Sequence, residues 1–464
     1  MVRLLLALFL FFPLSAEATF YRVASISING NNKTHSKIIL RELDFEVGDS
    51  IKADQLDKVI QQANEQVFNT FLFITSQVKV DSIINNEIFV SIHVKERWYV
   101  FPVPVLEFAD RNFNQWYLSR DPSRFNYGLY LRWDNVRGRR ESLRLTLSNG
   151  YTRKIGLFYR FPFIFNSKTI GLDLNLNLVN NREIGFRTEK DKLQFYNDNE
   201  IDMIKRREFG IALTYRKKIF TTQSLGLNYY QIEIADTVTQ SNLNPNFLAG
   251  GERVQKSLEL KYLLIRDRRD YRPYPLKGDY TEIDASYNSL GLKQENINPQ
   301  NGLFRFSINY RKYFDLGKRQ YFSLAGKVKV SNNFFIPYFN SRALGYEDYL
   351  RGYEYYVIDG SHFALLKLNY KINIIKPGAI EFKFIPIPKF NKVPYALYFN
   401  LYSDVGYVEN RMPNIYENTL NSRTLNSYGA GFDFVTYYDR VVRFEYSLNT
   451  IGDQFFYLHF KSAF

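Results

Sequence analysis

The residues that most often carry catalysis or bind metals are sparse in this chain. There is no cysteine, and none of the four histidines (His35, His93, His362 and His459) has a metal-ligand spacing such as H-x-x-x-H. The sequence also lacks a G-x-S-x-G nucleophile motif, a phosphate-binding P-loop and a dinucleotide-binding glycine pattern. These absences argue against a disulfide scaffold, a zinc finger, an iron–sulfur protein and a lipase. We therefore expect no enzymatic activity, no metal and no cofactor.

The composition points away from a soluble enzyme. Among 464 residues, 36 Tyr, 41 Phe and 3 Trp make 17% of the chain aromatic. Aromatic belts at two membrane–water interfaces would use such an excess. Lys and Arg number 61 against 47 Asp and Glu, a net charge of +14, but the basic residues are dispersed, so no nucleic-acid partner is expected. Attraction to anionic lipids or to acidic clients would use the charge, and a compositional bias without a partner is the alternative.

The first residues resemble an export signal. Arg3 precedes an apolar run over 4–14, too short to span a bilayer, and Ala16-Glu17-Ala18 fits a cleavage site. We predict a signal peptide at 1–18, with an N-terminal anchor helix as the alternative. No later stretch reaches 18 consecutive apolar residues, so no transmembrane helix is predicted. The protein is expected in the periplasm, in the outer membrane or outside a bacterial cell.

Residues 19–98 predict a small α+β domain in the order β-α-α-β-β. Period-two alternation predicts strands over 21–28, 74–81 and 88–96, and apolar residues at three- and four-residue steps predict a helix over 53–69. A shorter helix follows Thr34. The motifs that make this segment recognisable are Ile26-x-Ile28-x-Gly30-Asn31-x-x-Thr34, Ile39-x-Arg41-Glu42-Leu43, Gly48-Asp49, Asn69-x-x-Leu72-Phe73 and Val94-x-Glu96-Arg97.

Together these motifs resemble a POTRA domain, the periplasmic module of outer-membrane assembly and translocation proteins. The resemblance implies that unfolded client segments bind by adding a strand to an exposed sheet edge. The alternative is an α+β spacer that binds nothing.

Residues 99–464 alternate with period two, segment after segment. Apolar residues at 170–178, 304–310, 322–330 and 442–448 share one face, and polar or charged residues share the other. A soluble sandwich of 366 such residues would need an enormous core, whereas a barrel in lipid needs no second sheet. At roughly 23 residues per strand and connection, we predict a transmembrane antiparallel β-barrel of about 16 strands, with 14 or 18 as alternatives.

The end of the chain carries the sharpest local pattern. Phe456, Leu458, Phe460 and Phe464 share one face of a final strand that ends on an aromatic residue. This arrangement resembles the terminal signal by which outer-membrane barrels reach their insertion machinery.

Two motifs inside the predicted barrel resemble the BamA/TamA-like outer-membrane assembly and translocation superfamily, the bacterial surface antigen family. Arg351-Gly352-Tyr353 resembles its V-R-G-F/Y motif, which lies at the tip of a long loop folded into the lumen. Tyr402-x-Asp404-x-Gly406 resembles its F-x-D-x-G inner-wall motif, and parity puts these three residues on the lumenal face. The resemblance implies that Arg351 pairs with Asp404 and stacks on Tyr402, because a guanidinium inside a barrel needs a carboxylate fork. The alternative is a surface-loop arginine.

Further stretches extend the resemblance over nearly the whole mature chain. They are Asp267-x-x-Asp270 with Pro275-x-x-Gly278, Trp133 to Arg139, and Tyr428-Gly429-Ala430-Gly431-Phe432. Pro102 and Pro104 lie where the first barrel strand begins, which suggests a weak seam between the first and last strands or, alternatively, a rigid linker. A single POTRA-like unit is fewer than insertases of this superfamily typically have.

The resemblance implies a bacterial outer-membrane protein with its POTRA domain in the periplasm. It would insert β-barrel proteins into the outer membrane or move proteins across it. The expected partners are unfolded outer-membrane or secreted clients, outer-membrane lipids and accessory assembly subunits. The alternatives are a secretion pore dedicated to one partner protein and a passive porin-like channel.

Overall fold

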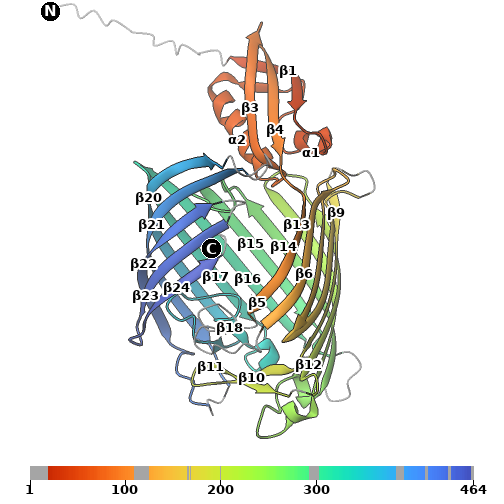
Figure 1. The fold of residues 1–464 in the computed structure, drawn as a ribbon, viewed down its shortest axis with the longest axis vertical. Coiled ribbons are helices and arrows are strands. Elements are labelled where there is room, and N and C mark those ends of the chain that lie inside the picture. Colours follow the sequence, from red (N-terminus) through yellow and green to blue (C-terminus); the bar gives the residue numbers. More distant parts are fainter. Residues whose placement is uncertain are drawn as a thin grey trace, which may run out of the picture. The chain divides into compact units, whose positions relative to one another are not determined.

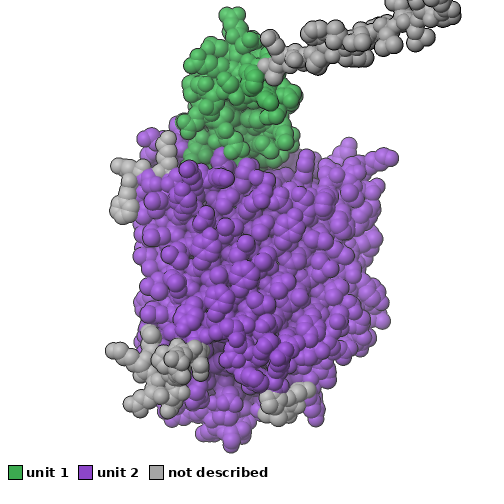
Figure 2. All heavy atoms as spheres, turned by 180° about the vertical axis from the view of Figure 1, so that it is seen from behind, with its two compact units in different colours: residues 1–32, 39–96 green, residues 33–38, 97–464 purple. Residues whose placement is uncertain are grey.

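The protein forms two compact units, coloured separately in Figure 2. A computed structural model describes residues 19–108, 125–164, 167, 169–198, 200–291, 302–382, 391–412, 416–436 and 440–460. The first unit contains residues up to Asn32 and Ile39–Glu96, and the second contains Lys33–Ile38 and Arg97–Phe464. The predicted signal peptide at 1–18 lies outside the described residues.

The N-terminal domain has the predicted helices and strands and one additional strand. The elements are β1 (Phe20–Asn29), α1 (Ser36–Leu40), β2 (Ser50–Lys52), η1 (Ala53–Gln55), α2 (Leu56–Phe68), β3 (Phe73–Ile84) and β4 (Glu87–Glu96). The sheet order is β2-β1-β4-β3, with β1 parallel to β4 and the other pairs antiparallel. β2 was not predicted, because three residues are too few to show a period-two pattern.

Local sequence explains the main elements of this domain. α2 buries Leu56, Ala63 and Val67 on one face, as its apolar spacing requires. The β3–β4 hairpin turns at Asn85 and Asn86, which both have positive φ. Asparagine tolerates this left-handed conformation, which matches the twist of a tight hairpin.

The body of the second unit is an antiparallel sheet of sixteen strands that rolls into a barrel (Figure 1). Its strands are β5 (Val100–Phe108), β6 (Phe125–Val136), β7 (Glu141–Gly150), β8 (Thr152–Phe161), β9 (Ile170–Asn181), β12 (Ile204–Tyr215), β13 (Thr221–Ile234), β14 (Val254–Asp267), β15 (Gly278–Asn288), β16 (Leu303–Gly317), β17 (Gln320–Ser331), β20 (His362–Glu381), β21 (Lys392–Glu409), β22 (Thr424–Thr436), β23 (Arg440–Asn449) and β24 (Gln454–Phe460). The predicted fold class and strand number are confirmed.

Alternation along the strands separates an apolar outer face from a polar inner face. Val328 on β17 is 48% exposed and Phe456 on β24 is 78% exposed, and both point outward. On β21 the outward Leu401 is exposed, whereas the inward Tyr402 and Asp404 are buried. Successive side chains of a strand point to opposite faces, so the face of one residue gives the face of every other residue in that strand.

The two rims of the barrel differ in their connections. We call the rim at which β5 begins the near end and the opposite rim the far end. Near-end connections such as 137–140 and 318–319 are short turns. The far end carries longer connections, including the hairpins β10 (Glu183–Glu189) with β11 (Lys192–Asn197) and β18 (Arg342–Leu344) with β19 (Ile358–Asp359).

The first and last strands form the edges of the sheet. Within the described residues no ladder joins β5 to β24, which is described only as far as Phe460. β5 contains Pro102 and Pro104, which is consistent with its edge position because proline cannot donate to a ladder. Among the described residues, no helix has both the length and the apolar character needed to cross a bilayer.

Candidate functional site in the barrel lumen

The long far-end connection 332–361, between β17 and β20, packs against the inner wall. Its apolar side chains form one core with inward-facing residues of β20, β21 and β22. That core contains Ala343, Leu344, Leu350, Tyr353 and Ile358 from the connection, and Phe363, Leu365, Val408 and Leu425 from the wall. The connection is therefore a lumenal loop and not a solvent-exposed surface loop.

Arg351 is held at the centre of this loop by residues of three wall strands. Its Nε donates to Asp404 Oδ2 at 2.8 Å, and its Nη2 donates to the other carboxylate oxygen. Its Nη1 donates to Asn369 Oδ1 at 2.7 Å and lies 3.4 Å from Glu445 Oε1. Its Cζ lies 3.8 Å from the centroid of the Tyr402 ring. Arg351 and Asp404 are both buried, so the charge depends on these partners and not on water.

Small residues let the loop and Tyr402 approach the wall. Gly406 is inward-facing, and a Cβ there would lie 3.1 Å from side-chain atoms of Leu344 and Leu350. The Tyr402 hydroxyl hydrogen-bonds Ser447 and lies over Gly429, where an added Cβ would collide with it. The wall therefore fits this loop closely.

The two residues after Arg351 are also fixed. Gly352 has a φ of +80°, a left-handed conformation that a side chain would strain, and its carbonyl accepts from Asn449 Nδ2 at 2.7 Å. The Tyr353 hydroxyl lies 2.8 Å from Thr450 Oγ1 and donates to the carbonyl of Asn426. The loop is thus tied to the β23–β24 turn as well as to the wall.

The loop then contacts the last strand. Glu354 Oε1 lies 3.0 Å from His459 Nε2, and Tyr355 packs edge-on against Phe455 with ring centroids 4.6 Å apart. The Tyr356 hydroxyl donates to Asp453 Oδ2 at 2.8 Å. Residues 351–356 therefore connect the inner wall to β24, one of the two sheet edges.

A second buried cluster lies beside the first and centres on Asp433 of β22. Arg443 Nε donates to Asp433 Oδ1 at 2.7 Å, the Tyr274 hydroxyl donates to Oδ2 at 2.8 Å, and Lys371 Nζ lies 3.6 Å from Oδ2. Tyr274 belongs to the near-end connection 268–277. Arg443 also lies 3.7 Å from Glu445, the carboxylate that faces Arg351. The two clusters form one chain of alternating charges between a near-end loop and a far-end loop.

The comparisons with known proteins agree with this architecture. The Omp85 superfamily domain matches residues 135–436, and a POTRA match, described as a surface antigen variable number repeat, covers residues 21–97. The chain belongs to the Omp85 superfamily. This membership and the BamA-like fold below confirm the resemblance seen in the sequence, and they make the protein an outer-membrane β-barrel protein of that family.

Solved Omp85 structures share the fold at low sequence identity. A crystal structure of BamA from Haemophilus ducreyi lacking POTRA domains 1–3 matches with a TM-score of 0.50 and 15% identity, covering 95% of this chain and 84% of that chain. CdiB from Acinetobacter baumannii matches with a TM-score of 0.51 and 14% identity, covering 95% and 73%. No curated protein matched the sequence.

The Omp85 barrel places the sequence-predicted residues as follows. Arg351 and Gly352 meet Asp404 and Tyr402 in one site, and Gly406 lies under the same loop. Phe456 and Phe460 point outward on β24 with Leu458 on the same face, whereas Phe464 lies outside the described residues.

Sequence reasoning missed several contributors to the site. They are Asn369, Lys371, Glu445, Asp433, His459 and Tyr274. The inward parity of Arg443 and Glu445 was visible in the alternating pattern, but nothing local indicated which partners they face. Among the described residues, no group of three or more His, Asp or Glu side chains could hold a metal ion.

The far end of the Omp85 barrel carries its own anchored connection. Asp191, at the tip of the β10–β11 hairpin, accepts from the backbone amides of Thr419 and Leu420 at 3.0 Å and from Thr419 Oγ1 at 2.9 Å. Its carbonyl also accepts from the amide of Val357 in the lumenal loop. The hairpin is therefore attached to the β21–β22 connection and to the lumenal loop.

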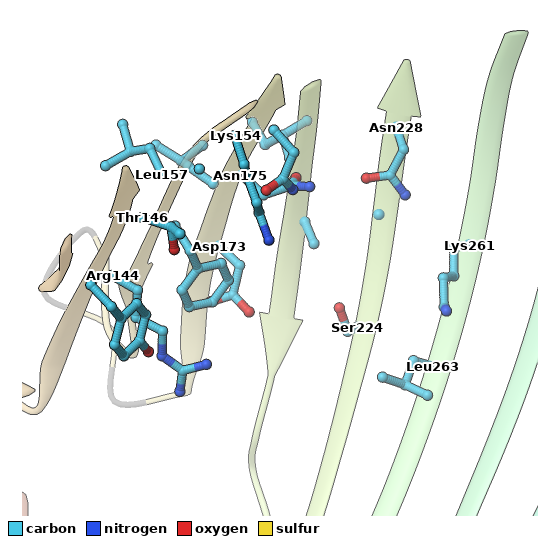
Figure 3. A pocket seen from close by; sticks show the side chains of 18 residues that line it. Arg144, Thr146, Lys154, Leu157, Asp173, Asn175, Ser224, Asn228, Lys261 and Leu263 are labelled. Carbon is cyan, nitrogen blue, oxygen red and sulfur yellow. The ribbon is translucent and has the colours of Figure 1, made fainter. Parts of the chain in front are cut away.

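The inner wall across β7 to β14 is open by contrast. A cavity of about 520 Å³ lies there, and Figure 3 shows Arg144, Lys154, Lys261 and Asn228 among the side chains that line it. Within the described chain neither Arg144 nor Lys154 forms an ion pair, and Arg144 instead lies 5.5 Å from the Phe158 ring. The charged residues that line this cavity, Arg144, Lys154, Asp173 and Lys261, are net basic, and every described residue that lines it lies on a strand.

Proposed function

We propose that this Omp85 protein is an outer-membrane assembly and translocation factor: it receives unfolded polypeptides at a periplasmic POTRA domain and inserts them into the outer membrane or moves them across it. The observation that carries the proposal is the sixteen-strand Omp85 barrel with a lumenal loop fixed by Arg351. BamA and CdiB, whose folds it shares, belong to this family. No bond is made or broken in such a function, and client strand pairing and lipid burial would supply the energy.

The POTRA sheet supports the receiving step. β3 is an edge strand that pairs only with β4 among the described strands, so its outer backbone groups are available to an added strand. Ile83 and Ile84 at its end are exposed and offer apolar contact. A hydrogen bond from Ser91 holds the pKa of Asp81 on β3 below its usual range, and the Asp81 charge on this edge discourages indiscriminate pairing.

The lumenal loop favours a gated barrel over a passive porin. A porin needs an open channel, whereas here a loop of 30 residues, tied by a buried guanidinium, occupies the β20–β24 side of the lumen. Release of the loop would need the Arg351–Asp404 pair to break. Removing one member of a buried pair typically costs about 3–5 kcal/mol, because the other charge is left without a partner.

The proposal is tested first by conductance in planar bilayers. Arg351→Ala is expected to raise the open-channel current or its open probability above that of the wild type, because the loop loses its anchor. Arg144→Ala removes the same charge from the open wall and serves as the matched control. A large, steady current that neither substitution changes would favour the porin instead.

Cells distinguish the two ways in which clients could be handled. Depletion of the protein is expected to lower the outer-membrane levels of several unrelated barrels if it inserts them. Loss of one secreted protein with normal barrel levels would favour the dedicated secretion pore. The cavity along β7 to β14 is the observation that supports this second candidate, because it leaves unfilled space along the inner wall.

A further inference from the structure

Charge is distributed unevenly between the two rims of the barrel. Four near-end connections are described in full, 137–140, 216–220, 268–277 and 318–319, and together they carry twelve Lys or Arg and one Asp. Three far-end connections of more than one residue are described in full, 235–253, 332–361 and 450–453, and they carry three Lys or Arg against seven Asp or Glu. Among the connections that are described in full, positive charge is therefore concentrated at the near end.

Three of the near-end connections are neighbours. Connection 216–220 joins β12 to β13, 268–277 joins β14 to β15, and 318–319 joins β16 to β17, and these six strands are consecutive in the sheet. We call these three connections the basic arc. With a strand spacing of about 4.8 Å, the arc extends along roughly 24 Å of the rim.

Two connections of the arc, 216–220 and 318–319, lie at the edge of the apolar outer face. Tyr215 immediately precedes connection 216–220, and Phe314 and Leu316 lie just before 318–319. All three side chains are exposed on the outer face or at its end. Aromatic residues at such positions mark the membrane–water interface of a transmembrane barrel. A turn of two or five residues cannot carry its side chains far from that interface.

Four side chains of the arc are available to a ligand. Lys217, Lys218, Lys318 and Arg319 are exposed, and within the described residues none of them forms an ion pair. Other basic residues of the arc are engaged, since Arg269 and Arg272 both contact Asp267. The arc thus combines fixed basic residues with long, flexible ones that reach toward headgroups from an apolar border.

We propose that the basic arc binds the anionic headgroups of phospholipids in the leaflet at the near end of the barrel. The inference rests on the membrane-embedded barrel of the proposed function but not on its gating or its clients. Anionic lipid is favoured over an acidic polypeptide because the basic residues border the lipid-facing surface. A basic residue near a membrane surface gains about fivefold in affinity for anionic lipid.

The test measures lipid selectivity of the full mature chain in bilayers. The protein is reconstituted in phosphatidylcholine with trace spin-labelled phosphatidylglycerol or spin-labelled phosphatidylcholine, and the ratio of their association constants is obtained from electron paramagnetic resonance spectra. The wild type is expected to prefer phosphatidylglycerol by at least about threefold. The variant K217Q/K218Q/K318Q/R319Q is expected to bring the ratio close to one, and added salt is expected to lower the wild-type ratio.

A matched variant removes the same charge from the far end. K190Q/K192Q/R253Q/R423Q changes four exposed far-end residues and is expected to keep the wild-type ratio. Faster migration of unheated samples on gels verifies that each barrel is folded. The proposal is overturned if the wild type shows no preference for phosphatidylglycerol or if the arc variant keeps that preference. It is also overturned if the far-end variant loses as much of the preference as the arc variant does.

A competing ligand is tested in the same samples. If poly-glutamate binds the wild type, loses affinity in the arc variant and leaves the lipid ratio unchanged, the arc serves acidic polypeptides and the lipid proposal is wrong. The conductance of Arg351→Ala and the barrel levels in depleted cells do not depend on the lipid association ratio. If the lipid test fails, the proposed function still stands. If the proposed function fails, the lipid proposal still stands.

Discussion

The inner wall of the barrel has two halves built on the same alternating pattern, and they differ in what covers them. On β20 to β24, Asp404, Asp433 and Ser427 are all 0% exposed because two loops pack over them. On β7 to β14, Arg160 donates from Nε and Nη2 to the two carboxylate oxygens of Asp173, yet its side chain remains 51% exposed. The same kind of ion pair is therefore structural in one half and solvated in the other.

The difference shows that strand parity decides which side chains enter the lumen but not how much water they retain. A charge under a loop depends on its protein partners, whereas a charge beside the cavity can be hydrated. The packed half should therefore respond strongly to substitutions that the open half tolerates.

The largest contrast is expected between two aspartates. Asp433→Ala leaves Arg443 and Lys371 buried without their carboxylate and should lower the free energy of unfolding by about 3–5 kcal/mol. Asp173→Ala removes a pair whose arginine is half exposed to water and should cost about 0–1 kcal/mol. Urea unfolding of protein folded in lipid vesicles measures both. Equal losses would mean that the two halves are packed alike.

A smaller contrast is expected between two inward-facing glycines. A Cβ at Gly429 would collide with the Tyr402 hydroxyl and the Tyr446 carbonyl, so Gly429→Ala should cost about 1–3 kcal/mol. A Cβ at Gly226 would lie 3.4 Å from Ala212 Cβ, an ordinary contact, so Gly226→Ala should change the stability little. The same unfolding assay measures both variants. If Gly429→Ala does not lower the stability, the wall beneath the lumenal loop can rearrange to accept the added methyl group.

The smallest contrast is expected in how readily a water-soluble reagent reaches two positions on the inner wall. The chain has no cysteine, so single thiols can be introduced without background. Ser224→Cys lines the cavity and should react with a water-soluble maleimide at least about tenfold faster than Ser427→Cys, which lies under the lumenal loop. Arg351→Ala should raise the Ser427→Cys rate. Similar rates at the two positions in the wild type would show that the loop does not stay in place.

Much of the architecture was predictable because it is written in local patterns. Alternation gave the two faces of several barrel strands, the length of the segment gave about 16 strands, and the helix spacing of α2 gave the second helix of the POTRA domain. β2 and the hairpins β10–β11 and β18–β19 were not predicted, because such short elements form only where other parts of the chain hold them.

The pairing of Arg351 with Asp404 was expected from the superfamily resemblance, and the structure brings the two groups together. Its neighbours could not be predicted. Tyr274 and Asp433 are 159 residues apart, and Asp191 and Thr419 are 228 apart. No period or spacing connects residues over such distances.

The sequence by itself determined the wall of this protein, since the face of each side chain follows from its position along a strand. Only the tertiary structure decided which half of that wall is covered, because loop placement depends on contacts between residues that are far apart in the chain. The tertiary structure likewise determines the open cavity, the buried chain of charges and the position of the basic arc at one rim.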